Sequence, residues 1–280
     1  QHLWPLLLVI PHLFNPRPAP VLGAVLLVIA IGVTVSRFFY RASAAHRVFA
    51  LAAWGGALAI YLTSLLPSVL PGDSGEFQLA PYVLGVPHPT GYPLWVLLGN
   101  LMSRLPIGSV AYRLNLLSAL SGALAVLGLY AAARALGARP TVSLLTALAF
   151  AATPTMWEQS VRAEKYALNA AFVALTLWLL LQWRQPRRAR WLNLFAFAYG
   201  LSLTHHRTMA LMAPAYALFI ILEGRAVLRV RRLLTLAALF VLPLGLYLAL
   251  PILSGRHPPV NFLQPNTARQ FFDLILASTY

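Results

Sequence analysis

Two carboxylates stand in the most polar stretch of an otherwise apolar chain. Asp73 and Glu76 lie three residues apart in Pro-Gly-Asp-Ser-Gly-Glu-Phe, directly after a long apolar run. A helix that begins there places both carboxylates on one side. Such a pair can form a helix capping box or supply a preorganised general base. It can also bind a divalent cation, but two oxygen ligands alone are weak evidence, so we predict no metal site.

A second stretch, residues 85–93, follows closely and carries His88 and Tyr92. It holds three prolines and two glycines in nine residues, a composition that excludes a regular helix and predicts a stiff, folded loop. Because it lies close to Asp73 in sequence, we expect it to form a wall of the same cavity. The alternative is a structural turn in which His88 is only hydrogen-bonded.

A third polar stretch carries Glu158, Arg162, Glu164 and Lys165. If it is helical, Glu158, Arg162 and Lys165 share one face. One interpretation is a solvated helix at the membrane interface with an internal ion pair. The other is a contact to phosphate or sugar, because the Arg guanidinium matches phosphate oxygens and Lys supplies a point charge.

The fourth group is His205, His206 and Arg207. The residues between Arg190 and Glu223 are too few for two full membrane crossings, which need about 40 residues. The turn between them is therefore predicted to lie below the membrane surface. Polar groups at depth are costly unless they line a cavity or meet a partner; the alternative is that these side chains extend to lipid headgroups.

The composition predicts that membrane helices position these groups. The chain has 280 residues, of which 60% are hydrophobic and 10% charged, and its mean hydropathy is +0.73. Soluble domains carry about 25% charged residues, so an ordinary water-exposed surface is excluded. A net charge of +15 would indicate nucleic acid in a soluble protein, but here we predict lipid or phosphate contacts and no nucleic acid. The lack of cysteine excludes disulfides and thiolate sites.

Eight apolar runs predict an all-α, polytopic membrane helix bundle of about eight spanning helices. They lie near residues 19–36, 48–70, 113–133, 141–156, 166–183, 191–204, 208–222 and 233–253. Arginines cluster in alternate loops, which the positive-inside rule assigns to the cytoplasm. Among the acidic residues only Glu223 then falls on the cytoplasmic side. The chemistry is therefore predicted to be extracytoplasmic.

The same map divides the chain into three parts. Residues 1–47 are predicted to form one or more extra membrane helices, and residues 254–280 the start of a further external segment. Residues 48–253 form the transmembrane core, with external loops at 71–112, 157–165 and 205–207. Because the chain begins at Gln1 and closes no obvious element at Tyr280, we expect a fragment of a longer chain.

The stretch from Pro71 to Trp95 resembles a known family. It is similar to the bacterial relatives of the eukaryotic transmembrane protein O-mannosyltransferases, within the glycosyltransferase C superfamily. The likeness is carried by residues 73–77 and 84–94, with Thr90 in place of a second proline. It continues at Trp157, in residues 163–169 and in residues 200–206, and covers about residues 48–253.

This resemblance implies a multi-pass glycosyltransferase of the bacterial cytoplasmic membrane. It would move a sugar, mannose in the named family, from a polyprenyl-phosphate donor to an acceptor hydroxyl on the outer side. Asp73 would match the superfamily's catalytic carboxylate and act as general base, supported by Glu76. The candidate substrate-binding residues are His88, Tyr92, Arg162, Glu164, Lys165, His205, His206 and Arg207. No cofactor is expected, and the partners are the donor, membrane lipids and an acceptor that the sequence leaves open.

Two other classes of function remain as alternatives. The chain can be a non-catalytic membrane subunit that scaffolds a larger assembly with other membrane subunits, or a transporter of lipids or sugar-lipids. The intact pair of Asp73 and Glu76 favours an enzyme over a scaffold. A transporter needs a path on both faces, whereas the predicted cytoplasmic loops are short and basic.

Overall fold

The computed structural model describes residues 44–184, 189–224, 227 and 229–278. Within these ranges it contains helices, loops and one isolated β-bridge. The elements are α3 (Ala44–Thr63), α4 (Asp73–Tyr82), α5 (Pro93–Ser103), α6 (Val110–Ala135), α7 (Pro140–Ala151), α8 (Pro154–Ser160), α9 (Lys165–Arg184), α10 (Ala189–Leu203), η2 (Arg207–Met212), α11 (Ala213–Glu223), α12 (Val230–Leu244), η4 (Gly245–Leu248), α13 (Ala249–Ser254) and α14 (Ala268–Leu276). The predicted all-α membrane bundle is confirmed, and the apolar run at 19–36 lies outside the described residues.

Four helical segments are long and apolar enough to cross a membrane, namely Ala44–Thr63, Val110–Ala135, Lys165–Arg184 and Val230–Ser254. They correspond to four of the predicted apolar runs. The other described runs form shorter helices: α10 has 15 residues and α11 has 11. The run at 141–156 is divided into α7 and α8, because Pro154 favours the start of a new helix rather than the interior of an old one. The chain is a multi-pass membrane protein.

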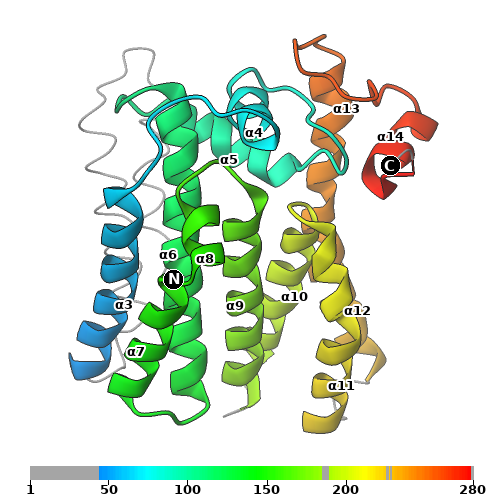
Figure 1. Cartoon of the computed structure of the whole chain (residues 1–280). Helices are drawn as coiled ribbons and strands as arrows, with labels where there is room; N and C mark the ends of the chain where they lie inside the picture. Colours follow the sequence, from blue (N-terminus) through cyan, green and yellow to red (C-terminus); the bar gives the residue numbers. More distant parts are fainter. Residues whose placement is uncertain (1–43, 185–188, 225–226, 228, 279–280) are drawn as a thin grey trace.

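Helix α6 is the centre of the bundle. It packs against α9, α3 and α7, and it is the most buried of the four candidate membrane segments. Helix α10 joins α9 on one side and α12 on the other. The long helices run side by side, whereas α4 and α5 lie across the upper end of α6 and α9 in Figure 1. The polar stretch that begins at Asp73 is therefore held over one end of the bundle.

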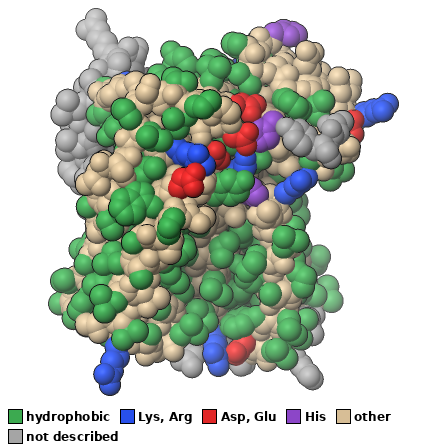
Figure 2. All heavy atoms as spheres, viewed as in Figure 1, with side chains coloured by type: hydrophobic (Ala, Val, Ile, Leu, Met, Phe, Trp, Pro, Cys, Tyr) green, Lys and Arg blue, Asp and Glu red, His purple; other side chains and the backbone are tan. Residues whose placement is uncertain are grey.

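The two ends of the bundle carry different loops. Helices α6, α9 and α11 end, and α3, α7, α10 and α12 begin, at the lower end in Figure 1. Arginines cluster near these helix ends in the sequence, for example Arg134, Arg184 and Arg231. Most of the acidic and histidine side chains visible in Figure 2 gather toward the upper end. The assignment of the lower end to the cytoplasm stays a prediction.

A buried amide pair fixes α4 to the central helix. The Gln78 side chain donates from Nε2 to Oδ1 of Asn115, at 2.8 Å. The same oxygen accepts the Ala163 backbone N–H at 2.8 Å, and Nδ2 of Asn115 donates to the Leu66 carbonyl at 2.7 Å. Asn115 is fully buried, so these partners satisfy polar groups that would otherwise be costly in the interior. One side chain of α6 thus positions the segments on both sides of the site.

The loop that contains residues 83–92 is held by the chain that follows α13. The Val86 N–H donates to the Val260 carbonyl at 2.8 Å, and Val86 packs in a buried cluster with Leu250 and Leu274. Gly91 has a φ of +78°, and a Cβ there would lie 2.7 Å from Cδ1 of Leu250. A side chain is therefore excluded at this turn by both backbone and space.

Candidate active site

Asp73 is paired with a lysine from a distant helix. Lys165, the first residue of α9, donates from Nζ to Oδ2 of Asp73 at 2.7 Å. The Lys165 side chain is 8% exposed, whereas that of Asp73 is 55% exposed. The hydrogen bond from Lys165 lowers the pKa of Asp73 below its ordinary value; partial burial opposes this, and the charges of Lys165 and His88 add to it. Asp73 is thus an ionised, accessible carboxylate held from behind by an ammonium.

Glu76 holds His88. Its Oε1 accepts the His88 backbone N–H at 2.9 Å, and its Oε2 bonds the ring nitrogen Nδ1. The other ring nitrogen, Nε2, lies 4.0 Å from Oδ2 of Asp73 and 3.4 Å from the Tyr92 hydroxyl. The predicted loop therefore does form a wall beside Asp73, and it places an imidazole between the two carboxylates.

The capping interpretation of the carboxylates does not describe α4. The N-cap is Gly72, which makes no side-chain cap hydrogen bond, and Asp73 and Glu76 both lie in the first turn. Carboxylates there interact favourably with the helix dipole. A Cβ at Gly75 would lie 2.3 Å from the Leu70 carbonyl oxygen, so the glycine permits the preceding chain to pass close by. Both carboxylates are left to make contacts outside their own helix.

Three aromatic rings complete the surroundings of the Lys165 ammonium. Its Nζ lies 5.0 Å from the ring centroid of Phe77, 5.9 Å from that of Tyr92 and 5.2 Å from that of Tyr166. Ring faces stabilise a cation electrostatically, which supports a charged ammonium in a largely buried position. Tyr92 is itself 5% exposed, and burial, followed by the charge of Asp73, raises its pKa above the ordinary value.

Glu164 reinforces the same junction. It precedes Lys165 in the chain and accepts a hydrogen bond from Ser74 Oγ at 3.0 Å, so two consecutive residues hold Asp73 and Ser74. Glu164 is 5% exposed. Its second oxygen, Oε2, is buried and has no hydrogen-bond partner in the described part of the chain. The geometry therefore gives Glu164 one contact to α4 and one unused acceptor.

The turn after α10 brings His205 and His206 close to Tyr92, with ring centroids 6.4 Å and 6.2 Å from that of the tyrosine. His205 is fully buried, with Nε2 2.8 Å from the Lys165 carbonyl oxygen. Since a carbonyl only accepts, Nε2 carries the hydrogen. The ring stacks on Trp95 with a centroid distance of 6.0 Å. Burial lowers the pKa of His205 to about 3. His205 thus faces protein, and the depth of this turn below the membrane surface stays a prediction.

His206 and Arg207 lie nearer the surface. The His206 ring is 5.9 Å from that of Tyr166 and 6.2 Å from that of Tyr92. Burial, and then the charges of Lys165 and Arg207, lower the pKa of His206 to about 4. Arg207 is exposed and donates from Nη1 to the Leu276 carbonyl at 3.4 Å. Arg207 therefore adds an exposed positive charge near this end of the site, whereas His206 is a neutral ring next to Tyr92 and Tyr166.

Arg162 has a different partner. Its Nη2 lies 3.0 Å from Oε1 of Glu158, four residues earlier, which is the local ion pair that the sequence left as one interpretation. Helix α8 ends at Ser160 and α9 begins at Lys165. The face expected to be shared by Glu158, Arg162 and Lys165 is therefore interrupted, and only Lys165 reaches Asp73.

The cation alternative for the carboxylates can be tested against their contacts. In the described ranges no group of three or more His, Asp or Glu side chains is arranged to hold a metal ion. Asp73 already bonds the Lys165 ammonium, and Glu76 already bonds His88. Each carboxylate therefore has a protein partner on the side where a bridging ion would lie.

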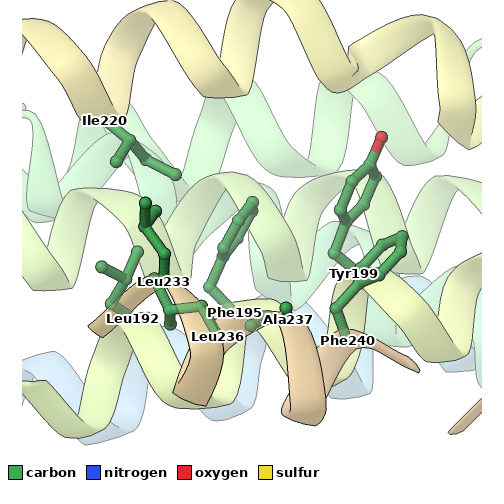
Figure 3. Close-up of a pocket in the computed structure, with 9 residues that line it drawn as sticks. Leu192, Phe195, Tyr199, Ile220, Leu233, Leu236, Ala237 and Phe240 are labelled. Atoms are coloured by element: carbon green, nitrogen blue, oxygen red, sulfur yellow. The ribbon is translucent and has the colours of Figure 1, made fainter. Parts of the chain in front are cut away.

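A cavity of about 370 Å³ lies apart from these groups. It opens between α10, α11 and α12 (Figure 3) and is lined by Leu192, Phe195, Ala196, Tyr199, Ile220, Leu233, Leu236, Ala237 and Phe240. The Tyr199 hydroxyl donates to the Met209 carbonyl at 3.0 Å, two residues after Arg207. The cavity is thus apolar, and one wall is bonded to the short helix that begins at Arg207.

The residues missed in the sequence are the buried ones that hold the site together. Gln78, Asn115 and Ser74 make hydrogen bonds beneath α4, and Trp95 donates from Nε1 to the Phe77 carbonyl at 3.1 Å. The available signal was Asn115 itself, a strongly polar residue within an apolar run. Its fully buried amide finds its partners in loops rather than in its own helix.

Fold and site together define a multi-pass membrane protein with a carboxylate, lysine and histidine cluster at one end of its helix bundle. Comparison with known families identifies it further. Residues 73–228 match the family model described as the protein O-mannosyl-transferase TMEM260 N-terminal domain, and the chain belongs to this family. The resemblance drawn from the sequence motifs is confirmed.

Two curated relatives show the extent of the similarity. The chain is 37% identical over 206 residues to the mouse protein O-mannosyl-transferase TMEM260, which is 70% of the chain and 29% of that relative. It is 29% identical over 183 residues to protein O-mannosyl-transferase tmem260 of Dictyostelium discoideum, or 59% of the chain and 22% of the relative. The chain thus spans less than a third of the length of these relatives. No solved structure matches it.

Proposed function

We propose that this protein is a membrane mannosyltransferase that moves mannose from a polyprenyl-phosphate donor to a protein hydroxyl, with Asp73 as general base. The names of its relatives support mannosyl transfer to a protein oxygen. The observation that carries the proposal is the pairing of Asp73 with Lys165. It presents an ionised, 55% exposed carboxylate next to a cation that is 8% exposed.

The chemistry needs little more than these two charges. A polyprenyl phosphate is a good leaving group, so the reaction requires a base for the acceptor hydroxyl and cations for the phosphate. Asp73 accepts the hydroxyl proton while the acceptor oxygen bonds to the anomeric carbon and the bond from that carbon to the phosphate oxygen breaks. Attack from the side opposite the phosphate inverts the anomeric centre. Glu76 supports Asp73 by holding His88 at its side.

The donor is placed by charge and by apolar surface. Lys165, His206 and Arg207 bind the phosphate, since ion-assisted hydrogen bonds to phosphate are among the stronger polar contacts. The apolar cavity beside η2 has the lining that a hydrocarbon chain requires. The phosphate contact predicted for Arg162 is not part of this proposal, because its guanidinium is paired with Glu158 at 3.0 Å. Glu164 is assigned to the sugar through its unpartnered Oε2.

The active face is proposed to be extracytoplasmic, in a bacterial cytoplasmic membrane. Support comes from the arginines near the ends of α6 and α9 and the starts of α10 and α12, at the end of the bundle opposite α4, since basic residues flanking membrane helices favour the cytoplasm. Single cysteines at Ser68 and Ala189, which are both exposed, then label from opposite sides of a sealed membrane. Labelling of both from the same side contradicts the orientation.

The decisive experiment neutralises Asp73 without changing its shape. Asp73→Asn keeps an acceptor for Lys165 but removes the basicity, so we expect transfer from polyprenyl-phosphate mannose to fall by about 10²- to 10⁴-fold. The readout is incorporation of radiolabelled mannose into protein of a cell lysate. Glu158→Gln is the matched control, because it also neutralises an ion-paired carboxylate and should keep the wild-type rate. A wild-type rate for Asp73→Asn would overturn the assignment; a wild-type chain without transfer would favour the scaffold alternative.

A further inference from the structure

His88 is oriented as a hydrogen-bond acceptor toward Asp73. Both its backbone N–H and its ring nitrogen Nδ1 bond Glu76. Because a carboxylate only accepts, Nδ1 carries the ring hydrogen, and Nε2 of the neutral imidazole keeps its lone pair. That lone pair lies on the side of Oδ2 of Asp73, at 4.0 Å, and of the Tyr92 hydroxyl, at 3.4 Å.

The second observation concerns the base itself. The pair with Lys165 keeps Asp73 ionised but also makes it a weak base, since its pKa lies below the ordinary value. A proton taken from an acceptor hydroxyl is therefore held poorly, and the step is favourable only if the proton moves on. Lys165 is already bonded to this carboxylate and carries its full set of protons. The group on the other side of Asp73 that can take a proton is His88.

We propose that His88 receives the proton that Asp73 takes from the acceptor, and that Glu76 stabilises the resulting imidazolium. The inference rests on the proposed mannosyl transfer. Asp73 gains the hydroxyl proton as the glycosidic bond forms and the phosphate departs. Its new O–H bond then breaks, the proton bonds to Nε2 of His88, and Asp73 returns to carboxylate. The proton finally leaves to water, and the imidazole is neutral again.

The distances permit this transfer. At 4.0 Å the two atoms are not directly hydrogen-bonded, but the Asp73 side chain is 55% exposed and can rotate toward His88 or bond it through one water. Glu76 is 25% exposed and His88 is 12% exposed, so the imidazolium would form next to a partly desolvated carboxylate. This is the arrangement in which a carboxylate orients a histidine and stabilises its charged form.

The titratable groups near His88 act on an imidazolium in opposite directions. From α4 these are Asp73 and Glu76, both carboxylates that favour the imidazolium. From its own loop it is Tyr92, whose raised pKa keeps the hydroxyl neutral. The ammonium of Lys165, on α9, opposes the imidazolium. This ammonium is bonded to Asp73, however, and the negative charge of that carboxylate offsets it. Glu76, bonded to Nδ1, therefore supplies the counter-charge for an imidazolium formed by the transfer.

The test combines two substitutions with a small-molecule base. His88→Ala should lower kcat for radiolabelled mannose transfer by about 10²-fold or more, leave the KM for polyprenyl-phosphate mannose unchanged, and regain activity when imidazole is added. His88→Asn retains an N–H for Glu76 but has no basic nitrogen, so it should stay as slow as His88→Ala. An unchanged kcat with a raised donor KM would overturn the relay, because it assigns His88 to substrate binding.

Two further results would also overturn it. Recovery of the wild-type rate in His88→Asn shows that His88 only positions Glu76, and a slow His88→Ala that imidazole does not rescue shows that no base is missing. Asp73→Asn keeps the two proposals apart. If it abolishes transfer while His88→Ala retains kcat, only the relay fails. If Asp73→Asn retains the wild-type rate, the assignment of Asp73 fails, and the relay falls with it.

Discussion

Two ion pairs near α9 show how differently the same chemistry can be used. Arg162 and Glu158 are four residues apart and are 33% and 59% exposed. Lys165 and Asp73 are 92 residues apart, and their side chains are 8% and 55% exposed. The first pair is a local, partly exposed contact between α8 and the segment that follows it, of the kind that contributes little. The second pair joins α9 to α4, and only its cation is removed from water.

The difference locates the functional end of the molecule. A buried ammonium needs a counter-charge, so Lys165 holds Asp73 in place. Asp73, being exposed, remains free to meet a substrate on its other side. An ion pair with both side chains buried would only stabilise the fold, because no substrate could reach it. A pair with both side chains exposed would not fix the position of either side chain. Asymmetric burial is therefore what makes this pair a candidate for chemistry.

The largest expected effect is on turnover and comes from the buried partner. Lys165→Met removes the cation beside the departing phosphate, and loss of one such stabilising group costs about 10²- to 10³-fold in rate. Initial rates of mannose transfer for Lys165→Met and Glu158→Gln measure it. The comparison fails if the two variants are equally active.

Acid should destabilise the fold through the buried histidines. Burial lowers the pKa of His205 to about 3 and that of His206 to about 4, from 6.5 in the unfolded chain. Between pH 6.5 and these lowered pKa values, the two histidines therefore bind protons in the unfolded chain but not in the folded protein. The stability is fully present above pH 6.5 and falls as the pH decreases. Thermal unfolding of the detergent-solubilised protein should show this, and His205→Gln should weaken the dependence.

The two ion pairs should also differ in how much they contribute to the thermal stability of the protein. Asp73→Asn leaves a buried ammonium with a neutral acceptor, which we expect to cost about 1–3 kcal/mol. Glu158→Gln removes an exposed helix pair worth about 0.3–0.5 kcal/mol. The melting temperature of Asp73→Asn should therefore fall further than that of Glu158→Gln. Equal melting temperatures would show that Lys165 is better solvated than its 8% exposure indicates. The double variant Asp73→Asn with Lys165→Met should regain stability.

The smallest loss of turnover among the site variants is expected at the hydrogen bond between Ser74 and Glu164. Ser74→Ala removes the donor to Glu164, and a hydrogen bond to a charged group is worth about 1.5–3 kcal/mol at most. Because the Asp73–Lys165 pair and the Gln78–Asn115 contact still hold α4, we expect a loss near the lower end of that range. Transfer should fall only a few-fold. A loss of turnover as large as that of Lys165→Met would place Ser74 among the essential groups.

The sequence predicted the parts of this site that depend on local chemistry. A Gly- and Pro-rich loop next to a pair of carboxylates is unusual in an apolar chain, so Asp73, Glu76 and His88 were found. The pair of Glu158 and Arg162 follows from helical spacing alone. Apolar runs of sufficient length likewise predicted the long helices, because the bilayer sets that length.

The contacts that join distant segments were beyond such reasoning. Nothing in the spacing links Ser74 to Glu164, since their pairing depends on how α4 packs across α6. The break between α8 and α9 has the same origin. No glycine or proline lies in residues 161–164, but Asn115 accepts the Ala163 N–H and Ser118 bonds the Glu164 backbone. Side chains of α6 thus replace the helical hydrogen bonds that a continuous helix would have made.

A structure of the protein bound to a non-transferable polyprenyl-phosphate mannose analogue tests the central claim most directly. Our account predicts the phosphate within hydrogen-bond distance of Lys165 Nζ, with Arg207 on its other side, and the anomeric carbon facing Asp73. The hydrocarbon chain should run toward the cavity between α10 and α12. A phosphate bound instead among the arginines at the opposite end of the bundle, with the Asp73 and Lys165 pair unoccupied, would contradict it.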